Sequence, residues 1–240
     1  MMKMMILAPR RADMTHAQFR HHVTVVHGPL VRSVAEVAAD IHHYHYNFPV
    51  FGSVDPVFGH KVADHLDIVT QGWFDSREAQ LNNMRHPRYL SIIRPDEGRF
   101  ANESGALMHY THEVPVIPNP QLLNPLKAFY FRRRRPGLTR EVFQEAWHSR
   151  FGAAVALHHA REATMVKHVQ NHALAEANHP DGASTRFFDV IDEFFLRTPD
   201  SLLQLKTDTA ALEKMKVAEN ELLDVSRTMF LMTETIPGVP

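Results

Sequence analysis

Apolar runs and alternating positions predict four strands in the first 116 residues, over 4–8, 41–48, 65–74 and 105–116. Two helices are predicted between them, one beginning at Thr15 and the other at Asp75–Ser76. The predicted order of elements is therefore β-α-β-β-α-β, which is the ferredoxin-like arrangement.

The first predicted helix has a clear start and one apolar face. Thr15 and Gln18 have the spacing of a capping box. The apolar residues that follow keep helical spacing, so they are expected to form one buried stripe: Phe19, Val23, Val26 and Leu30.

The second half of the chain repeats this pattern. Strands are predicted over 126–132, 165–174, 187–196 and 227–236, with helices over 139–159 and from Thr198–Pro199 onward. Sliding the chain by 124 residues places Thr15 on Thr139 and Gly28 on Gly152, and an offset of 122 aligns 67–76 with 189–198. We predict a duplicated domain, 1–116 and 126–240, joined by a proline-rich linker over 117–125.

This pattern predicts an α+β fold. A ferredoxin-like unit has helices on one face of its antiparallel sheet, so the other face needs a partner. Two such units in one chain are expected to pack sheet to sheet, as an intrachain barrel-like pseudo-dimer.

Composition narrows the chemistry. The 240 residues carry a net charge of −1, so no overall field favours nucleic acid or an anionic membrane. There are no cysteines, which excludes thiol catalysis, iron–sulfur clusters and disulfides. No stretch approaches the roughly 20 apolar residues of a membrane-spanning helix. We expect a cytoplasmic protein with a small-molecule partner, and neither nucleic acid nor a membrane as a partner.

Three segments resemble one family. Phe19–Val31, with His27-Gly28-Pro29-Leu30 near its end, is similar to the EthD-like branch of the dimeric α+β barrel superfamily. Trp73–Ser76 and Pro95–Phe100 are further matches. The resemblance covers about 110 residues twice over.

The resemblance implies several activities. The superfamily includes cofactor-independent monooxygenases, muconolactone-type isomerases, polyketide cyclases and decarboxylases, and haem-binding branches. We expect first a cofactor-independent oxidoreductase or monooxygenase acting on an apolar cyclic or aromatic metabolite. The alternatives are a decarboxylase, cyclase or isomerase of the same fold, or a non-catalytic accessory subunit of an oxidation system.

Differences between the halves indicate where chemistry is located. The second half has Ala146 in place of His22 and Phe151 in place of His27. A fold that accepts phenylalanine at the second position does not need an imidazole there for packing. His27 is therefore the leading catalytic candidate, and His22 the second. The structural alternative is a helix-end histidine that bonds a carbonyl.

Aromatic and amide residues are the candidate substrate contacts. Tyr46 is expected to orient the substrate beside the two histidines, with Tyr44 and Asn47 from the same strand. Trp73 would form a wall, and Trp147 is the second-half aromatic at the position where the family has tryptophan. Core packing is the alternative for the tyrosines, and a shared structural bond for Asn47.

Other sites have weaker support. His43 and His45 share a strand face and suggest metal ligands, but no HExxH motif accompanies them. No feature identifies a haem ligand, so no metal and no cofactor is expected. Arg132–Arg135 is either an anion site or, as we favour, a solvated turn with salt bridges to the acidic C-terminal helix. A homodimer of the tandem unit is left open.

Overall fold

The computed structural model describes residues 1–120, 123–163, 165–174 and 187–239 and divides into two compact units. The first unit consists of Met1–Pro49, Asp64–His112 and Thr235–Pro240, and the second of Val50–Ala63 and Glu113–Glu234. Each unit thus contains a segment from the other half of the chain. The domain boundaries drawn from the duplication stay a prediction, and residues 121–122 of the proposed linker lie outside the described residues.

The first unit contains strands β1, β2 and β4, the first part of β5 and the end of β9. Its elements are β1 (Met2–Ala8), α1 (His16–His21), the π-helical turn η1 (His22–His27), α2 (Gly28–Ser33), α3 (Ala35–Ala38), β2 (His43–Pro49), β4 (Ile68–Phe74), α4 (Arg77–Arg85), the π-helical turn η2 (Tyr89–Ile93), α5 (Arg94–Glu97), the 3-10 turn η3 (Glu103–Gly105) and β5 (Leu107–Ile117).

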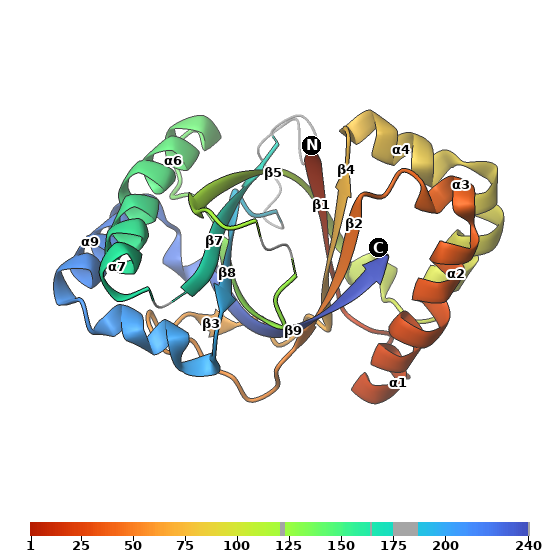
Figure 1. The fold of residues 1–240 in the computed structure, drawn as a ribbon, viewed down its shortest axis with the longest axis horizontal. Helices are drawn as coiled ribbons and strands as arrows, with labels where there is room; N and C mark the ends of the chain where they lie inside the picture. Colours follow the sequence, from red (N-terminus) through yellow and green to blue (C-terminus); the bar gives the residue numbers. More distant parts are fainter. Residues whose placement is uncertain (121–122, 164, 175–186, 240) are drawn as a thin grey trace. The chain divides into compact units, whose positions relative to one another are not determined.

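The sheet of the first unit is antiparallel, in the order β2-β4-β1-β5. Ala8 pairs with Ile68, and Tyr46 pairs with Thr70. Side chains alternate along each strand, so Tyr44 and Tyr46 share one face of the sheet. The helices α1 to α4 cover one side of these strands (Figure 1).

Helix starts follow the predicted caps. Thr15 accepts a hydrogen bond from the backbone of Gln18, whose side chain accepts one from the backbone of Thr15, so the predicted capping box is confirmed. Ser76 caps α4 through the backbone of Ala79. Such caps stabilise a helix by about 1 kcal/mol each, because they pair N–H groups that the helix leaves free.

From β6 to β9, the elements of the second unit repeat the β-α-β-β-α-β order; the complete set also includes β3 and part of β5. They are β3 (Lys61–Val62), the second part of β5, β6 (Leu126–Arg132), α6 (Arg140–Ala146), the π-helical turn η4 (Trp147–Gly152), α7 (Ala153–Glu162), β7 (Met165–Ala173), β8 (Val190–Leu196), the 3-10 helix η5 (Pro199–Lys206), α9 (Thr209–Leu222), the 3-10 turn η6 (Val225–Arg227) and β9 (Met229–Val239). Its helices α6, α7 and α9 lie on one side of β7 and β8 (Figure 1). Every predicted strand therefore overlaps a strand of the structure, and among the described residues only the two-residue β3 was not predicted.

The core of the second unit is packed with aromatic rings. The rings of Trp147 and Phe151 stack 4.2 Å apart at 12°. Phe143 stacks on Trp147 at 5.9 Å, and all three are fully buried. The three rings thus form a continuous stack along the buried face of the segment from α6 to η4.

Arg132 lies fully buried within this core. Its Nε donates to Asp192 at 3.1 Å and its Nη1 to Glu219 at 2.6 Å. Its guanidinium lies 4.4 Å from the ring of Tyr130 and 5.0 Å from that of Trp147. The expected solvated turn is therefore wrong for Arg132, because β6 carries it inward, whereas the expected bridge to the C-terminal helix is confirmed by Glu219 of α9.

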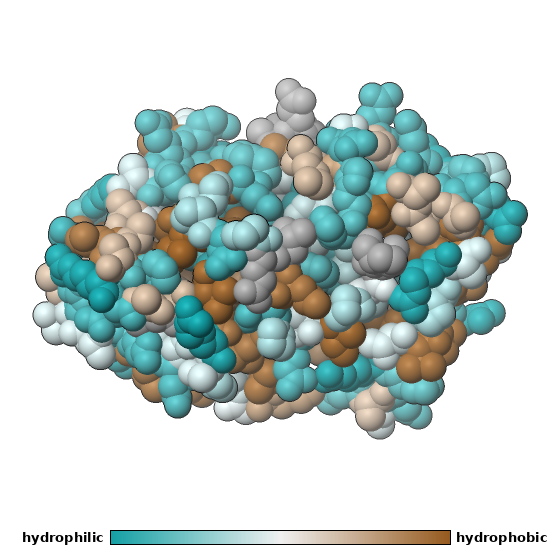
Figure 2. Space-filling model, viewed as in Figure 1, coloured by the Kyte–Doolittle hydropathy of each residue, from teal (hydrophilic) through white to brown (hydrophobic). Residues whose placement is uncertain are grey.

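The surface is mixed. Polar side chains cover most of the face seen in Figure 2, with apolar ones scattered between them. No helix among the described residues is both long enough and apolar enough to cross a membrane.

We expect Arg132→Ala to lower the free energy of unfolding by about 3–5 kcal/mol, since it leaves Asp192 and Glu219 buried without their cation. Urea denaturation followed by circular dichroism measures this change. Arg150→Ala is the matched control: Arg150 pairs with Glu221 at the surface, so its loss costs less than about 1 kcal/mol. Equal effects of the two substitutions would show that the buried cluster does not stabilise the unit.

Candidate functional site

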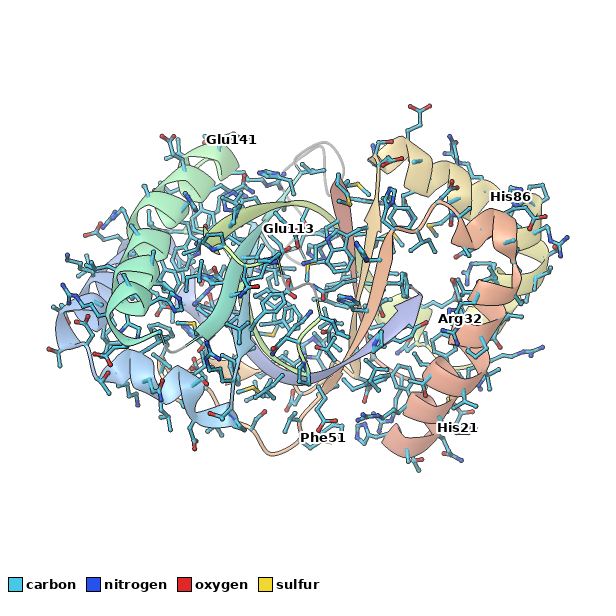
Figure 3. All side chains as sticks on the ribbon, viewed as in Figure 1. His21, Arg32, Phe51, His86, Glu113 and Glu141 are labelled. Carbon is cyan, nitrogen blue, oxygen red and sulfur yellow. The ribbon has the colours of Figure 1, made fainter. Side chains whose placement is uncertain are left out.

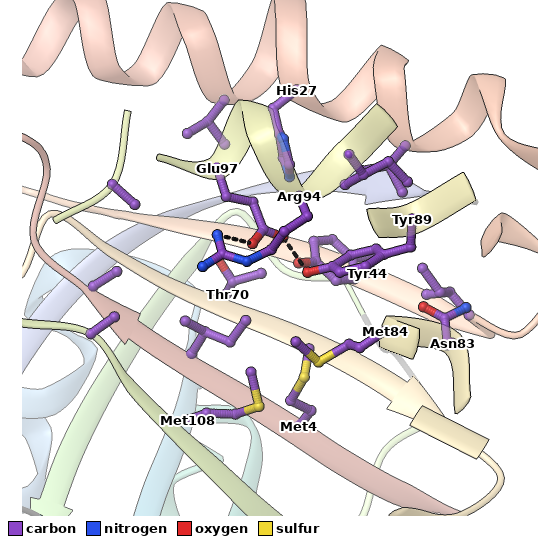
Figure 4. Close-up of a pocket in the computed structure, with 18 of the residues that line it drawn as sticks. Met4, His27, Tyr44, Thr70, Asn83, Met84, Tyr89, Arg94, Glu97 and Met108 are labelled. Carbon is purple, nitrogen blue, oxygen red and sulfur yellow. Dashed lines mark hydrogen bonds and ion pairs between the residues drawn. The ribbon is translucent and has the colours of Figure 1, made fainter. Parts of the chain in front are cut away.

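A cavity of about 270 Å³ lies within the first unit, between the helices and one face of the sheet. Most of its wall is apolar, and polar side chains from several elements interrupt it, as in small-molecule sites. Figure 4 shows His27 pointing into it toward Glu97, with Met4, Met84 and Met108 on the other side.

The π-helical turn η1 sets the direction of His27. The N–H of Gly28 bonds to the carbonyl of Val23, five residues earlier rather than four. The extra residue turns His27 inward and leaves it 6% exposed, while Val26 is 41% exposed. The predicted stripe is therefore wrong at Val26, because it assumed an uninterrupted α-helical period.

The same turn brings His22 and His27 to one carboxylate. Asp96 is buried and accepts from Nε2 of His22 at 3.0 Å and from Nδ1 of His27 at 3.1 Å. In a regular α-helix residues five apart lie about 140° apart, whereas i→i+5 bonding stacks them on one side. Both rings also pack on Phe100, with centroids 5.1 and 4.8 Å away.

His27 has the properties of a base. Because its Nδ1–H donates to Asp96, its lone pair is on Nε2, which has no hydrogen-bond partner among the described residues. Burial lowers the pKa of His27 below 6.5, partly opposed by the hydrogen bond to Asp96. The ring is therefore neutral at pH 7, and Asp96 would stabilise the imidazolium formed when Nε2 takes a proton.

Two tyrosines lie on the sheet side of the cavity. Burial raises the pKa of Tyr46 to about 12, so its hydroxyl is protonated at neutral pH. This hydroxyl is buried and has no partner among the described residues. It comes within 3.2 Å of the position that a Cβ on Gly28 would occupy, so a larger residue there would crowd this hydroxyl. Tyr44 lies beside it, with ring centroids 5.4 Å apart.

The end of β9 supports these tyrosines. The ring of Tyr46 lies 2.8 Å, and that of Tyr44 2.9 Å, from the position that a Cβ on Gly238 would occupy. Arg32 donates to the carbonyl of Gly238, and Figure 3 shows Arg32 beside this end of the strand. Thr235 donates to Asn47 at 2.8 Å.

Charged and phenolic groups form a chain at the cavity wall. Tyr89 donates to Glu97 at 2.6 Å, and Arg94 donates to the other oxygen of Glu97 at 3.2 Å. Arg94 also forms a two-point ion pair with Glu103 at the surface. Burial raises the pKa of Glu97 above 4.5.

Of the predicted site residues, His27, Tyr44 and Tyr46 line the cavity. The remaining four lie elsewhere, as follows. His22 is bonded to Asp96, which separates it from the cavity. Asn47 and Trp73 are on the opposite face of the sheet, where Asn47 donates to the carbonyl of Val69 and Trp73 lies beside Lys3. Trp147 donates to Asp192 in the second unit. Their part in binding or catalysis stays a prediction.

Sequence reasoning missed Asp96, Glu97, Tyr89 and Arg94. The segment Pro95–Phe100 was recognised only as a family match, without a role for its two acids. Two adjacent carboxylates on a short turn next to the apolar Ile93 were the available signal. Within the described ranges, no group of three or more His, Asp or Glu side chains is arranged to hold a metal ion.

A family model for the EthD domain matches residues 11–104, which include every polar cavity group described above. A conidial pigment biosynthesis dehydratase, EthD, of Metarhizium robertsii is 30% identical over 124 residues, covering 49% of this chain and 86% of that protein. The chain belongs to the EthD family.

Solved structures show the fold of this EthD-family protein. An anthrone oxidase-like protein has a TM-score of 0.60 at 12% identity, covering 100% of this chain and 94% of its own. A chlorite dismutase of Candidatus Nitrospira defluvii has a TM-score of 0.53 at 12% identity, covering 97% and 90%. The predicted fold, two ferredoxin-like units forming a dimeric α+β barrel, is thereby confirmed. A small-molecule enzyme of this fold is the function class that these relatives support.

The corresponding positions of the second unit are filled. At the offset of 124 residues, Arg132 takes the place of Ala8 and Phe151 that of His27, and Trp147 likewise replaces Val23. The strand register agrees, since Ala8 pairs with Ile68 and Arg132 with Val190. Larger side chains thus occupy the space that forms the cavity in the first unit.

We expect the pKa of His27 to lie below that of an exposed histidine, because burial disfavours its charged form. Asp96→Asn lowers its pKa further, since the carboxylate favours the imidazolium. Histidine NMR titration measures both, with the exposed His21 as an internal control (Figure 3). A His27 pKa above 6.5, or one raised by Asp96→Asn, would contradict the assignment.

Proposed function

We propose that the first unit is the enzymatic one and that it removes water from a small, cyclic, apolar β-hydroxy ketone. The observation that carries this proposal is the buried pair of Asp96 and His27, with Nε2 of His27 directed into an apolar cavity. The relative from Metarhizium robertsii is named a dehydratase, which supports the same reaction class here.

In this reaction His27 would act as the general base and Tyr46 as the hydrogen-bond donor to the substrate. Nε2 of His27 takes the proton from the carbon next to the ketone, while Tyr46 donates a hydrogen bond to the ketone oxygen. The resulting enolate re-forms the carbonyl and a carbon–carbon double bond, and the C–O bond of the neighbouring hydroxyl breaks. The hydroxyl leaves as water after taking one proton.

The cavity favours a flat, uncharged substrate. Its volume of about 270 Å³ suits a compound of two fused rings, and three methionines, Met4, Met84 and Met108, line it. Thioether sulfur packs well against aromatic ring edges. A product that becomes aromatic on losing water would thus be held by the same contacts.

A second candidate is the cofactor-independent oxidation favoured by the sequence. The same base would remove an acidic C–H proton, and molecular oxygen would then oxidise the carbanion to a ketone with release of water. The structural likeness to an anthrone oxidase-like protein favours this reaction. A decarboxylase, cyclase or isomerase would use the same base. A cytoplasmic location and a homodimer remain predictions.

Two model substrates distinguish the reactions. We expect purified protein to convert 3-hydroxy-1-tetralone to 1-naphthol and water without oxygen, followed by naphthol fluorescence. Oxidation would instead appear as oxygen uptake with anthrone, which becomes anthraquinone.

We expect His27→Ala to lower kcat/KM for the tetralone by about 10²–10⁴-fold, the usual contribution of a general base. His21→Ala, an exposed residue on the same helix, is the control and should retain full activity. Turnover that survives in folded His27→Ala would exclude His27 as the base. Oxygen-dependent turnover of anthrone alone would replace dehydration by oxidation.

A further inference from the structure

Glu97 is an acidic side chain on the cavity wall. It follows Asp96 on α5, and adjacent helical residues point about 100° apart. Asp96 therefore faces the two histidines, while Glu97 faces the cavity, 28% exposed. Figure 4 shows its carboxyl group between Arg94 and Tyr89, below the ring of His27.

Arg94, the cation next to Glu97, pairs mainly with another carboxylate, that of Glu103. Arg94 directs both Nη1 and Nη2 to Glu103, the second at 2.9 Å, and this matches the geometry of a two-point ion pair. Glu97 receives a single contact at 3.2 Å from the same guanidinium. The positive charge of Arg94 is thus largely balanced before it reaches Glu97.

The remaining neighbours are uncharged in the resting site. Tyr89 donates a neutral hydroxyl to Glu97, and burial together with Glu97 raises the pKa of Tyr89. Tyr44 has a pKa well above 10 for the same reason, and His27 is neutral. Burial raises the pKa of Glu97, while the hydrogen bond from Tyr89 and the charge of Arg94 lower it in part. The net direction is upward, so this carboxyl keeps its proton to higher pH than an exposed glutamate.

We propose that Glu97 is the general acid of the site and gives its proton to the leaving hydroxyl, with Tyr89 as a positioning residue. This proposal rests on the proposed dehydration. When His27 takes the C–H proton, the C–O bond breaks and the Glu97 proton joins the departing oxygen, which leaves as water. The cycle ends with His27 protonated and Glu97 ionised, and one proton returned from His27 to Glu97 restores both.

Kinetics test this role directly. We expect Glu97→Gln to lower kcat for 3-hydroxy-1-tetralone by about 10²–10⁴-fold. The fall in kcat/KM on the alkaline side, where Glu97 loses its proton, should disappear in this variant. Glu36→Gln, an exposed carboxylate paired with Arg88, is the control and should change neither.

Glu103→Gln gives a second measure that does not remove the acid. It releases Arg94 to pair with Glu97, and this favours the ionised carboxylate. The fall in kcat/KM on the alkaline side should therefore occur at lower pH in Glu103→Gln. The proposal would be overturned if the decrease in kcat/KM at high pH stayed at the same pH in Glu103→Gln. It would also be overturned if Glu97→Gln kept a near-normal kcat together with that decrease.

A binding assay separates this inference from the proposed reaction. Calorimetry would compare 3-methoxy-1-naphthol, whose ether oxygen can only accept a hydrogen bond, with 1-naphthol. In the native protein, the affinity for 3-methoxy-1-naphthol relative to that for 1-naphthol should fall as pH rises through the pKa of Glu97. In Glu97→Gln this affinity ratio should be independent of pH. This result without tetralone turnover would refute dehydration and leave Glu97 as the proton donor. An affinity ratio that does not change with pH in the native protein, or no binding of either naphthol, would refute the role of Glu97.

Discussion

The site of the first unit depends on one buried carboxylate. Asp96 has almost no contact with water, and a buried charge is tolerated only where donors surround it. Its donors are His22 and His27, five residues apart, which only the i→i+5 turn can place on the same side. The carboxylate, the turn and the orientation of the base therefore support one another, and a change in any of them disturbs all three.

The two units have similar backbones, but the first encloses a cavity where the second is filled with large side chains. Small side chains at Ala8 and Val23 leave a cavity beside His27. In the second unit Arg132 and Phe151 occupy the matching positions, and buried acids neutralise the guanidinium. One unit thus gives up core volume to accommodate a ligand, and the other uses that volume for packing.

Local signals predicted most of the fold, and long-range pairing decided the site. The capping box of Thr15 and the strand alternation depend on near neighbours, so both were correctly predicted. The contact between His27 and Asp96 spans 69 residues and could not be derived from spacing. The π-helical turn has no recognised residue signature, so the helical period was extended unchanged through Val26. Comparing the halves still made His27 the leading candidate, because Phe151 at the matching position shows that the fold does not need an imidazole there.

The exchange of segments between the units bears on how the chain matures. The first unit includes Thr235–Pro240, and Gly238 packs against Tyr44 and Tyr46. During synthesis, residues 1–112 leave the ribosome long before Thr235–Val239 are made. Tyr44 and Tyr46 therefore gain the strand that packs against them only after the whole chain between these two segments has been made.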